Sequence, residues 1–235
     1  MSCRTIARGA LFAGGLLLAG AIAAPQAHLA EARPAARQQR APRPAPPRRL
    51  PPNRVRPGGG LNPAQQACSD TTEALTALVP IDNPVMTERA YPSFWFYIPD
   101  RPEAIQSGEF ILLSADEKEQ VYAAPISLDQ TPGFVRLQLP ETLPVGLAAA
   151  ADYHWYLNLT CQADAGEETV LSVNGWIYRT DAIAQPDDSP AELWYDEVDQ
   201  TALRLLTDPE DSSAQQAWRE ILRRVDLVAP LVPLS

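Results

Sequence analysis

Residues 152–161 read Asp-Tyr-His-Trp-Tyr-Leu-Asn-Leu-Thr-Cys, and this stretch decides the expected fold. Large apolar residues or Cys fill every second position from Tyr153 onward. Because successive side chains of a β-strand point to opposite faces, the alternation predicts a strand with one buried face. The expected core residues are Tyr153, Trp155, Leu157, Leu159 and Cys161.

Further runs with a period of two lie on both sides of this strand, separated by turns rich in Pro, Gly, Asp and Asn. No helical pattern interrupts the series. Many short strands without intervening helices predict a mainly β fold, an antiparallel β-sandwich of the Ig-like or jelly-roll type. The predicted strands are residues 74–81, 93–98, 109–114, 120–123, 133–139, 152–161 and 169–180.

C-terminal to the strands the apolar period changes to that of a helix. Ser189-Pro190-Ala191-Glu192 has the composition of a helix start, with Ser189 as N-cap. Asp208-Pro209 predicts that a second helix begins at Asp208. We therefore expect a C-terminal α-helical hairpin that packs on the sandwich through an apolar stripe containing Trp194 and Trp218.

The N-terminal residues have the pattern of a targeting segment. Arg4 and Arg8 precede an apolar run at residues 10–24, and Ala21-Ile22-Ala23 near its end offers a small-x-small cleavage site. This order is typical of a secretory signal peptide, and the run is shorter than a membrane-spanning helix requires. We expect an exported protein, periplasmic or extracellular, without a transmembrane segment in the mature chain.

Charge divides the chain into a basic and an acidic part. Residues 31–60 hold eight Arg against one Glu, a net charge of +7, whereas residues 61–235 have a net charge of −19. The basic part is also rich in Pro and poor in large apolar residues, which predicts a disordered linker. The acidic part argues against nucleic acid as a partner. The expected segments are a signal peptide at 1–24, the linker at 25–66, the sandwich at 67–182 and the helical hairpin at 183–235.

Alternation also places several aromatic residues on the outer faces of the strands. They are Trp95, Tyr97, Tyr156, Trp176 and Tyr178. If they were exposed to solvent, these side chains would form an apolar patch larger than soluble monomers usually carry. Two uses are open: a platform for sugar rings or a partner protein, or the surface on which the helical hairpin packs. We favour the packing, with Trp194 and Trp218 on the helical side.

The predicted mature chain contains two cysteines, Cys68 and Cys161. In an exported protein such a pair predicts a disulfide. The alternative is a nucleophilic thiol that acts with His154. His154 and Cys161 have opposite strand parity, which argues against that pair.

No motif of a known catalytic chemistry is present in the sequence. It lacks a Gly-rich phosphate loop, a Gly-x-Ser-x-Gly elbow and the spacing of a metal site, so no cofactor or metal is expected. Acids such as Asp116 and Glu117 fall in predicted turns, where carboxylates are normally solvated. A carboxylate pair for glycoside hydrolysis stays open as an alternative.

Five segments follow one another in a characteristic order: residues 75–80, 92–99, 153–156 with Cys161, 175–177 and 194–196. Together they resemble the exported bacterial family called domain of unknown function 928. The resemblance spans residues 68–228 and implies a signal peptide, a Pro-rich spacer, a β-rich domain and a helical tail. It implies no catalytic residue. One departure is the short segment 181–190, where members of the family often carry a longer helical stretch.

The function expected from these features is that of an exported, non-catalytic envelope protein. It would bind an envelope protein or a polysaccharide through strand-connecting loops or the edge of the hairpin. The alternative is an envelope hydrolase whose carboxylate pair the sequence does not locate.

Overall fold

The structure is a computed structural model that describes residues 50–57, 67–69, 71–82, 85–162, 169–180 and 193–227. The predicted signal peptide and most of the predicted linker lie outside these residues. The described elements are β1 (Thr76–Ala77), β2 (Met86–Thr87), β3 (Ser93–Ile98), β4 (Ile105–Ser114), β5 (Gln120–Pro125), β6 (Gly133–Gln138), β7 (Ala151–Cys161), β8 (Val170–Arg179), α1 (Trp194–Thr207) and α2 (Ser212–Arg224).

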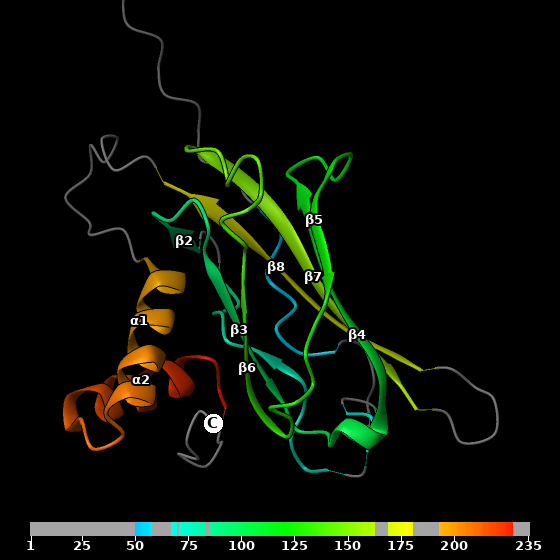
Figure 1. The fold of residues 1–235 in the computed structure, drawn as a ribbon, viewed down its shortest axis with the longest axis vertical. Coiled ribbons are helices and arrows are strands. Elements are labelled where there is room, and N and C mark those ends of the chain that lie inside the picture. Colours follow the sequence, from blue (N-terminus) through cyan, green and yellow to red (C-terminus); the bar gives the residue numbers. More distant parts are fainter. Residues whose placement is uncertain are drawn as a thin grey trace, which may run out of the picture. The chain divides into compact units, whose positions relative to one another are not determined.

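The described strands form two sheets, as expected for a β-sandwich (Figure 1). One sheet has the order β1-β3-β6 and the other the order β2-β8-β7-β4-β5. All strand pairs are antiparallel except β2 with β8. The sequence does not predict β2, because two residues are too few to show alternation. The first predicted strand, 74–81, is β-structure only at Thr76–Ala77.

The core lies between the two sheets and confirms the alternation of β7. Trp155 and Leu157 have no exposed surface. The Trp155 ring stacks on Phe110 of β4, with 6.4 Å between ring centroids, and packs edge-on against Phe96 of β3. On β8 the position opposite Trp155 is Gly175, where a Cβ would lie 2.5 Å from the indole. The large ring therefore requires the glycine.

A segment N-terminal to the predicted sandwich closes one side between the sheets. Arg54 pairs with Asn174 of β8 through two backbone hydrogen bonds, and the Val55 carbonyl accepts from Ala77 N of β1. Asn53 is buried, with its amide donating to the Pro80 carbonyl and accepting from Trp176 N. The prediction of a linker over 25–66 is therefore wrong for residues 50–57, which complete the sandwich.

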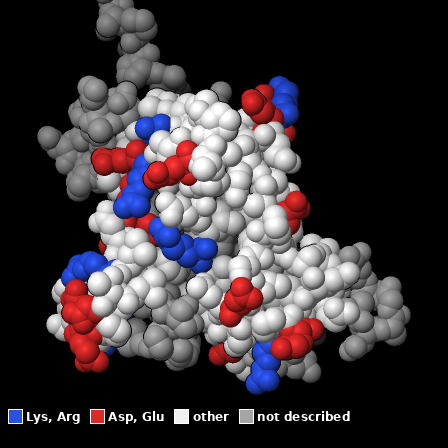
Figure 2. Space-filling view, in the orientation of Figure 1, with Lys and Arg blue, Asp and Glu red and all other residues white. Residues whose placement is uncertain are grey.

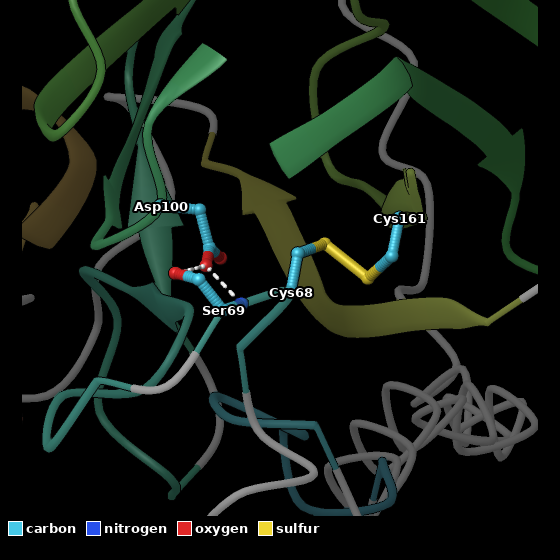
Figure 3. The surroundings of a disulfide bond; sticks show 4 residues. All are labelled: Cys68, Ser69, Asp100 and Cys161. Atoms are coloured by element: carbon cyan, nitrogen blue, oxygen red, sulfur yellow. Dashed lines mark hydrogen bonds between the residues drawn. A yellow bond between two sulfur atoms is a disulfide. The ribbon is translucent and has the colours of Figure 1, made fainter. Parts of the chain in front are cut away.

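The disulfide predicted between Cys68 and Cys161 is confirmed (Figure 3). It joins the segment before β1 to the end of β7, with the two Cα atoms 5.1 Å apart. Next to it, Ser69 donates to the buried Asp100 carboxylate through both its backbone N–H and its hydroxyl. Because both sulfurs are bonded to each other, neither is a free nucleophile for His154.

The C-terminal hairpin is confirmed, and α1 packs on β3 and β2 (Figure 1). The predicted start at Ser189 lies outside the described residues, and α1 begins at Trp194. The cap of α2 differs from the prediction. Asp211, not Asp208, accepts from the backbone N–H groups of Ser213 and Ala214. No helix in the described part of the chain is long and apolar enough to span a membrane.

The outward aromatics lie on two different surfaces. Trp95 and Phe134, on the outer face of the three-stranded sheet, pack edge-to-face against Trp218 of α2. Tyr97 contacts the Phe134 ring. Tyr156, Trp176 and Tyr178 alternate onto the outer face of the other sheet. The expectation that one hairpin covers all five is wrong, because the outer faces of a sandwich point in opposite directions.

Candidate binding site

A groove of about 1070 Å³ lies at one end of the sandwich, where strand-connecting segments meet. The β4–β5 turn forms one wall, residues 143–150 form the other, and the start of β7 contributes Ala151, Asp152 and Tyr153. Leu50 from the N-terminal segment also lines it. The expectation of a ligand site at strand-connecting loops or at the edge of the hairpin stays a prediction, and this groove is the candidate for it.

The wall formed by the β4–β5 turn is built around Asp116. Its carboxylate accepts from the Ser114 hydroxyl at 2.8 Å, from Lys118 N at 3.3 Å and from Lys118 Nζ at 2.9 Å. Hydrogen bonds from Lys118 and Ser114 lower the pKa of Asp116 to about 2. The next residue, Glu117, has φ of 58°, in the left-handed region that non-glycine residues rarely adopt. The tight turn therefore depends on side-chain contacts.

The opposite wall is fastened to the sandwich by backbone and side-chain hydrogen bonds. Leu147 N donates to the Ala90 carbonyl, and the Arg179 guanidinium donates to the Leu147 carbonyl. Ala148 N donates to the Tyr153 hydroxyl at 2.8 Å. At Gly146 a Cβ would lie 2.7 Å from the Ala90 carbonyl oxygen, so this close approach requires glycine. Both walls are therefore held in place before a ligand binds.

The groove lining carries acidic side chains. Asp116, Glu119 and Asp152 line it, and its lining contains no Lys or Arg, although Lys118 of the same turn is paired with Asp116. On the face shown in Figure 2, acidic and basic side chains of the described residues are intermixed, and no broad basic patch is visible. Apolar side chains such as Val121 and Leu143 complete the lining. Such a groove favours a ligand with positive charge and some apolar surface.

Behind the β4–β5 turn, His154 connects three elements. Its Nδ1 lies 2.6 Å from Glu117 Oε1, and its Nε2 lies 3.1 Å from Asn174 Oδ1 on β8. The imidazole stacks on Trp176, with 4.2 Å between centroids and 8° between planes. The Tyr156 hydroxyl lies 3.1 Å from Nδ1. Burial, followed by the charge of Glu117, raises the pKa of Tyr156, which keeps its hydroxyl neutral.

Two acids on α1 are buried, but they are not arranged as a catalytic pair. Asp199 accepts from Trp95 Nε1 at 3.0 Å, from Arg136 at 2.7 and 3.1 Å and from Arg89 at 3.0 Å. Burial raises the pKa of Asp199, but hydrogen bonds from Arg136 and Trp95 outweigh it and hold the pKa below its usual value. Asp196 accepts from Thr87 Oγ1 and from Glu88 N. These carboxylates therefore anchor α1 to the sandwich.

The Asp199 network and the His154 cluster are not predicted from the sequence. Arg136 is a weak signal for the first, because it interrupts an apolar strand at an outward position. For the second, strand parity places His154, Tyr156, Asn174 and Trp176 on one outer face, but Glu117 is expected to be solvated. The position of Glu117 next to His154 depends on the path of the β4–β5 turn. The described residues contain no group of three or more His, Cys, Asp or Glu that could hold a metal ion.

Comparison with known proteins adds a family but no activity. The model of the Domain of Unknown Function (DUF928) matches residues 55–188. No curated protein matches the chain. Among solved structures, the fn3 domain of human collagen alpha-1(XX) chain is similar at 14% identity over 49% of this chain and 85% of that one, with a TM-score of 0.25.

Proposed function

Since the family model matches more than half of the chain, the protein belongs to the family of the domain of unknown function DUF928, and we propose that it is an exported, non-catalytic binding module of the cell envelope. The proposed ligand is a basic segment of an envelope protein. It binds in the groove between the β4–β5 turn and residues 143–150.

The charge of the groove carries this proposal. Asp116, which is paired with Lys118, and the carboxylates of Glu119 and Asp152 line a volume of about 1070 Å³, and the lining contains no Lys or Arg. This volume is large enough for several side chains of a peptide. Both walls are fastened by hydrogen bonds, so the ligand would enter a groove that is largely preformed. A preformed site loses less conformational entropy on binding. Export is supported by the order of charged, apolar and small residues at 4–24.

The alternative function, an envelope hydrolase with a carboxylate pair, has less support. Such a pair needs one acid with a raised pKa beside the substrate. At the groove, the pKa of Asp116 is lowered. The buried Asp199 is surrounded by arginines, and its pKa is also lowered. Neither Asp116 nor Asp199 therefore has the raised pKa expected of a general acid.

Calorimetric titration of the purified chain with an oligo-arginine peptide and with neutral envelope oligosaccharides tests the ligand class. We expect binding of the peptide that weakens with salt, because exposed charges are screened. The double variant E119Q/D152N should reduce the affinity about three- to tenfold. The matched control E197Q/E210Q removes two exposed acids from the hairpin region and should leave the affinity unchanged. Binding of an oligosaccharide alone would contradict the proposed ligand.

Export is tested separately by mass spectrometry of the native protein after cell fractionation. A mature chain that begins near Ala24 and lies outside the cytoplasm is expected. An intact Met1 in a cytoplasmic pool would contradict the proposed location.

A further inference from the structure

Strand β5 lies at the edge of the five-stranded sheet. In the described part of the chain it pairs with β4 alone, and Figure 1 shows it at the margin of the sheet. Natural proteins protect such edges with charged side chains, with Pro, with bulges or with a covering segment. The six residues of β5 carry no charge, and their one Pro stands last. The register shift between Leu112 and Leu113 of β4 lies at the turn and leaves the rest of the pair regular.

The backbone groups that β5 directs away from β4 follow from the pairing. In an antiparallel pair, every second residue turns its N–H and C=O toward the partner strand and the next residue turns them away. Ile126 N, just after β5, donates to the Gly108 carbonyl of β4. The positions bonded to β4 are therefore Ile126 and, by alternation, Ala124. Ala123 consequently directs its N–H and C=O to the open edge, and so does the Pro125 carbonyl.

A strand added to β5 would run from the acidic groove to a second cavity. Gln120 and Val121 line the groove. Tyr122 and Pro125 line a cavity of about 360 Å³, whose opposite wall includes Leu137 of β6. A strand of five or six residues spans about 17–20 Å, the length of β5. Since strand side chains alternate between the two faces of a sheet, every second side chain of an added strand would point toward this cavity.

We propose that β5 receives the basic peptide of the proposed function as an additional strand. The inference rests on the proposed function for the charge of the ligand. The peptide main chain bonds to the N–H and C=O of Ala123 and donates to the Pro125 carbonyl. Alternate side chains enter the cavity beside Tyr122, and a basic side chain reaches Glu119 and Asp152 in the groove. Main-chain bonds supply affinity in this mode of recognition, and the pockets select the side chains.

Charge favours a basic peptide over a second copy of the chain at this edge. The β4–β5 turn contains three acids, Asp116, Glu117 and Glu119, against one base, Lys118. Another acid, Asp129, lines the second cavity beyond the other end of β5. Two copies of β5 that paired antiparallel would bring the acidic turn of one copy toward Asp129 of the other. Such like charges repel, whereas both ends of β5 attract a basic ligand.

Calorimetric titration of the full chain with a peptide of alternating Arg and Val, of about eight residues, tests the mode of binding. Neighbouring N–H groups of a strand point to opposite edges, so two modified peptides are compared, one N-methylated at every Arg and one at every Val. One of them should lose about tenfold or more in affinity, because it cannot donate to β5. The other should bind as the unmodified peptide does. Equal affinities of the two modified peptides would overturn the proposal.

The variant A123P tests the same contact from the side of the protein. It removes the outward N–H of β5 and keeps the bonds to β4, and Pro is tolerated at edge positions whose N–H faces solvent. We expect affinity for the unmodified peptide to fall about three- to tenfold, the value of one hydrogen bond. The matched control A123V keeps the N–H and should leave the affinity unchanged.

Equal affinity of folded A123P and A123V would contradict the added strand. Urea unfolding establishes whether A123P is folded, and if it is not, the two methylated peptides decide alone.

The binding function and the added strand can fail separately. If the Arg-Val peptide binds and both methylated versions bind equally, the basic ligand stands and the added strand fails. A peptide with Thr in place of Arg separates the other case. If it binds as well as the Arg-Val peptide and only one methylation pattern weakens it, the added strand stands and the basic ligand fails. Binding of neither peptide overturns both.

Sedimentation of the free chain tests the other occupant of the edge. A wild-type dimer that A123P abolishes would assign β5 to a second copy and overturn the proposal, whereas a monomer supports the peptide.

Discussion

The carboxylate of Asp199 on α1 lies 3.0 Å from the indole nitrogen of Trp95 on β3, 104 positions away in the sequence. Asp199 has no exposed side-chain surface, and Arg89 and Arg136 supply its positive partners. One buried charge therefore links the helical hairpin to the three-stranded sheet.

Replacing this charge should destabilise the whole domain. D199N leaves two arginines facing a neutral amide, and we expect a loss of about 2–3 kcal/mol in the free energy of unfolding. Urea unfolding followed by Trp fluorescence measures it. E197Q, an exposed position on the same helix, should change stability by less than about 0.5 kcal/mol. Equal stability of D199N and the wild type would show that the network does not hold the hairpin.

The same residue predicts a dependence on pH. The pKa of Asp199 is held below its usual value, so its contribution is fully present above the unfolded pKa of about 3.9 and is lost as pH falls through the folded pKa. The stability difference between the wild type and D199N should be constant between about pH 5 and 8 and shrink below about pH 4. Urea unfolding at several pH values measures this difference. A difference that grows toward acid pH would contradict the assignment.

The disulfide should contribute strongly, because 93 positions separate its cysteines. The double variant C68S/C161S is expected to lose about 4 kcal/mol, since the cross-link restricts the unfolded chain. Reduced wild-type protein should unfold at the same urea concentration as the double variant. As a check on the starting state, alkylation without reductant should label neither Cys68 nor Cys161.

Asn53 tests whether the N-terminal segment belongs to the sandwich. N53A removes an amide that bonds to Pro80 and Trp176, and should cost about 2–3 kcal/mol because the backbone partners stay buried. A chain that begins at Leu50 should keep the stability of the full chain, whereas one that begins at Gly58 should lose at least as much as N53A. Equal stability of both truncations would restore the linker boundary predicted from the sequence.

Variants of two aspartates near the start of α2 distinguish the N-cap in the structure, Asp211, from the predicted one, Asp208. D211A should cost about 1 kcal/mol, because Asp211 accepts from two free N–H groups of the helix. The carboxylate of Asp208 accepts from Glu210 N in the turn, not from the first turn of α2, so D208A should cost less than about 0.5 kcal/mol. Thermal unfolding of both variants decides between them.

The strands and the helical stripe could be predicted because they depend on local patterns. Residues 153–161 alternate between large apolar and mostly polar side chains, and the buried face of β7 follows from that alternation alone. The disulfide was also predictable, since the two cysteines of the predicted mature chain allow a single pairing. The candidate site was predictable only as a position, at strand-connecting loops.

The remaining features depend on which residues meet across the fold. A carboxylate in a sequence has the same appearance whether it is solvated, as expected for Glu117, or placed against a buried ring. The same holds for Asn53, whose amide joins the Pro80 carbonyl to Trp176 N, and for Asp199, whose partners Trp95, Arg136 and Arg89 lie far away in the sequence. The sequence by itself determined which faces are apolar, because burial follows periodicity. Only the tertiary structure decided which polar groups are paired, because hydrogen bonds and ion pairs require a partner within about 3 Å.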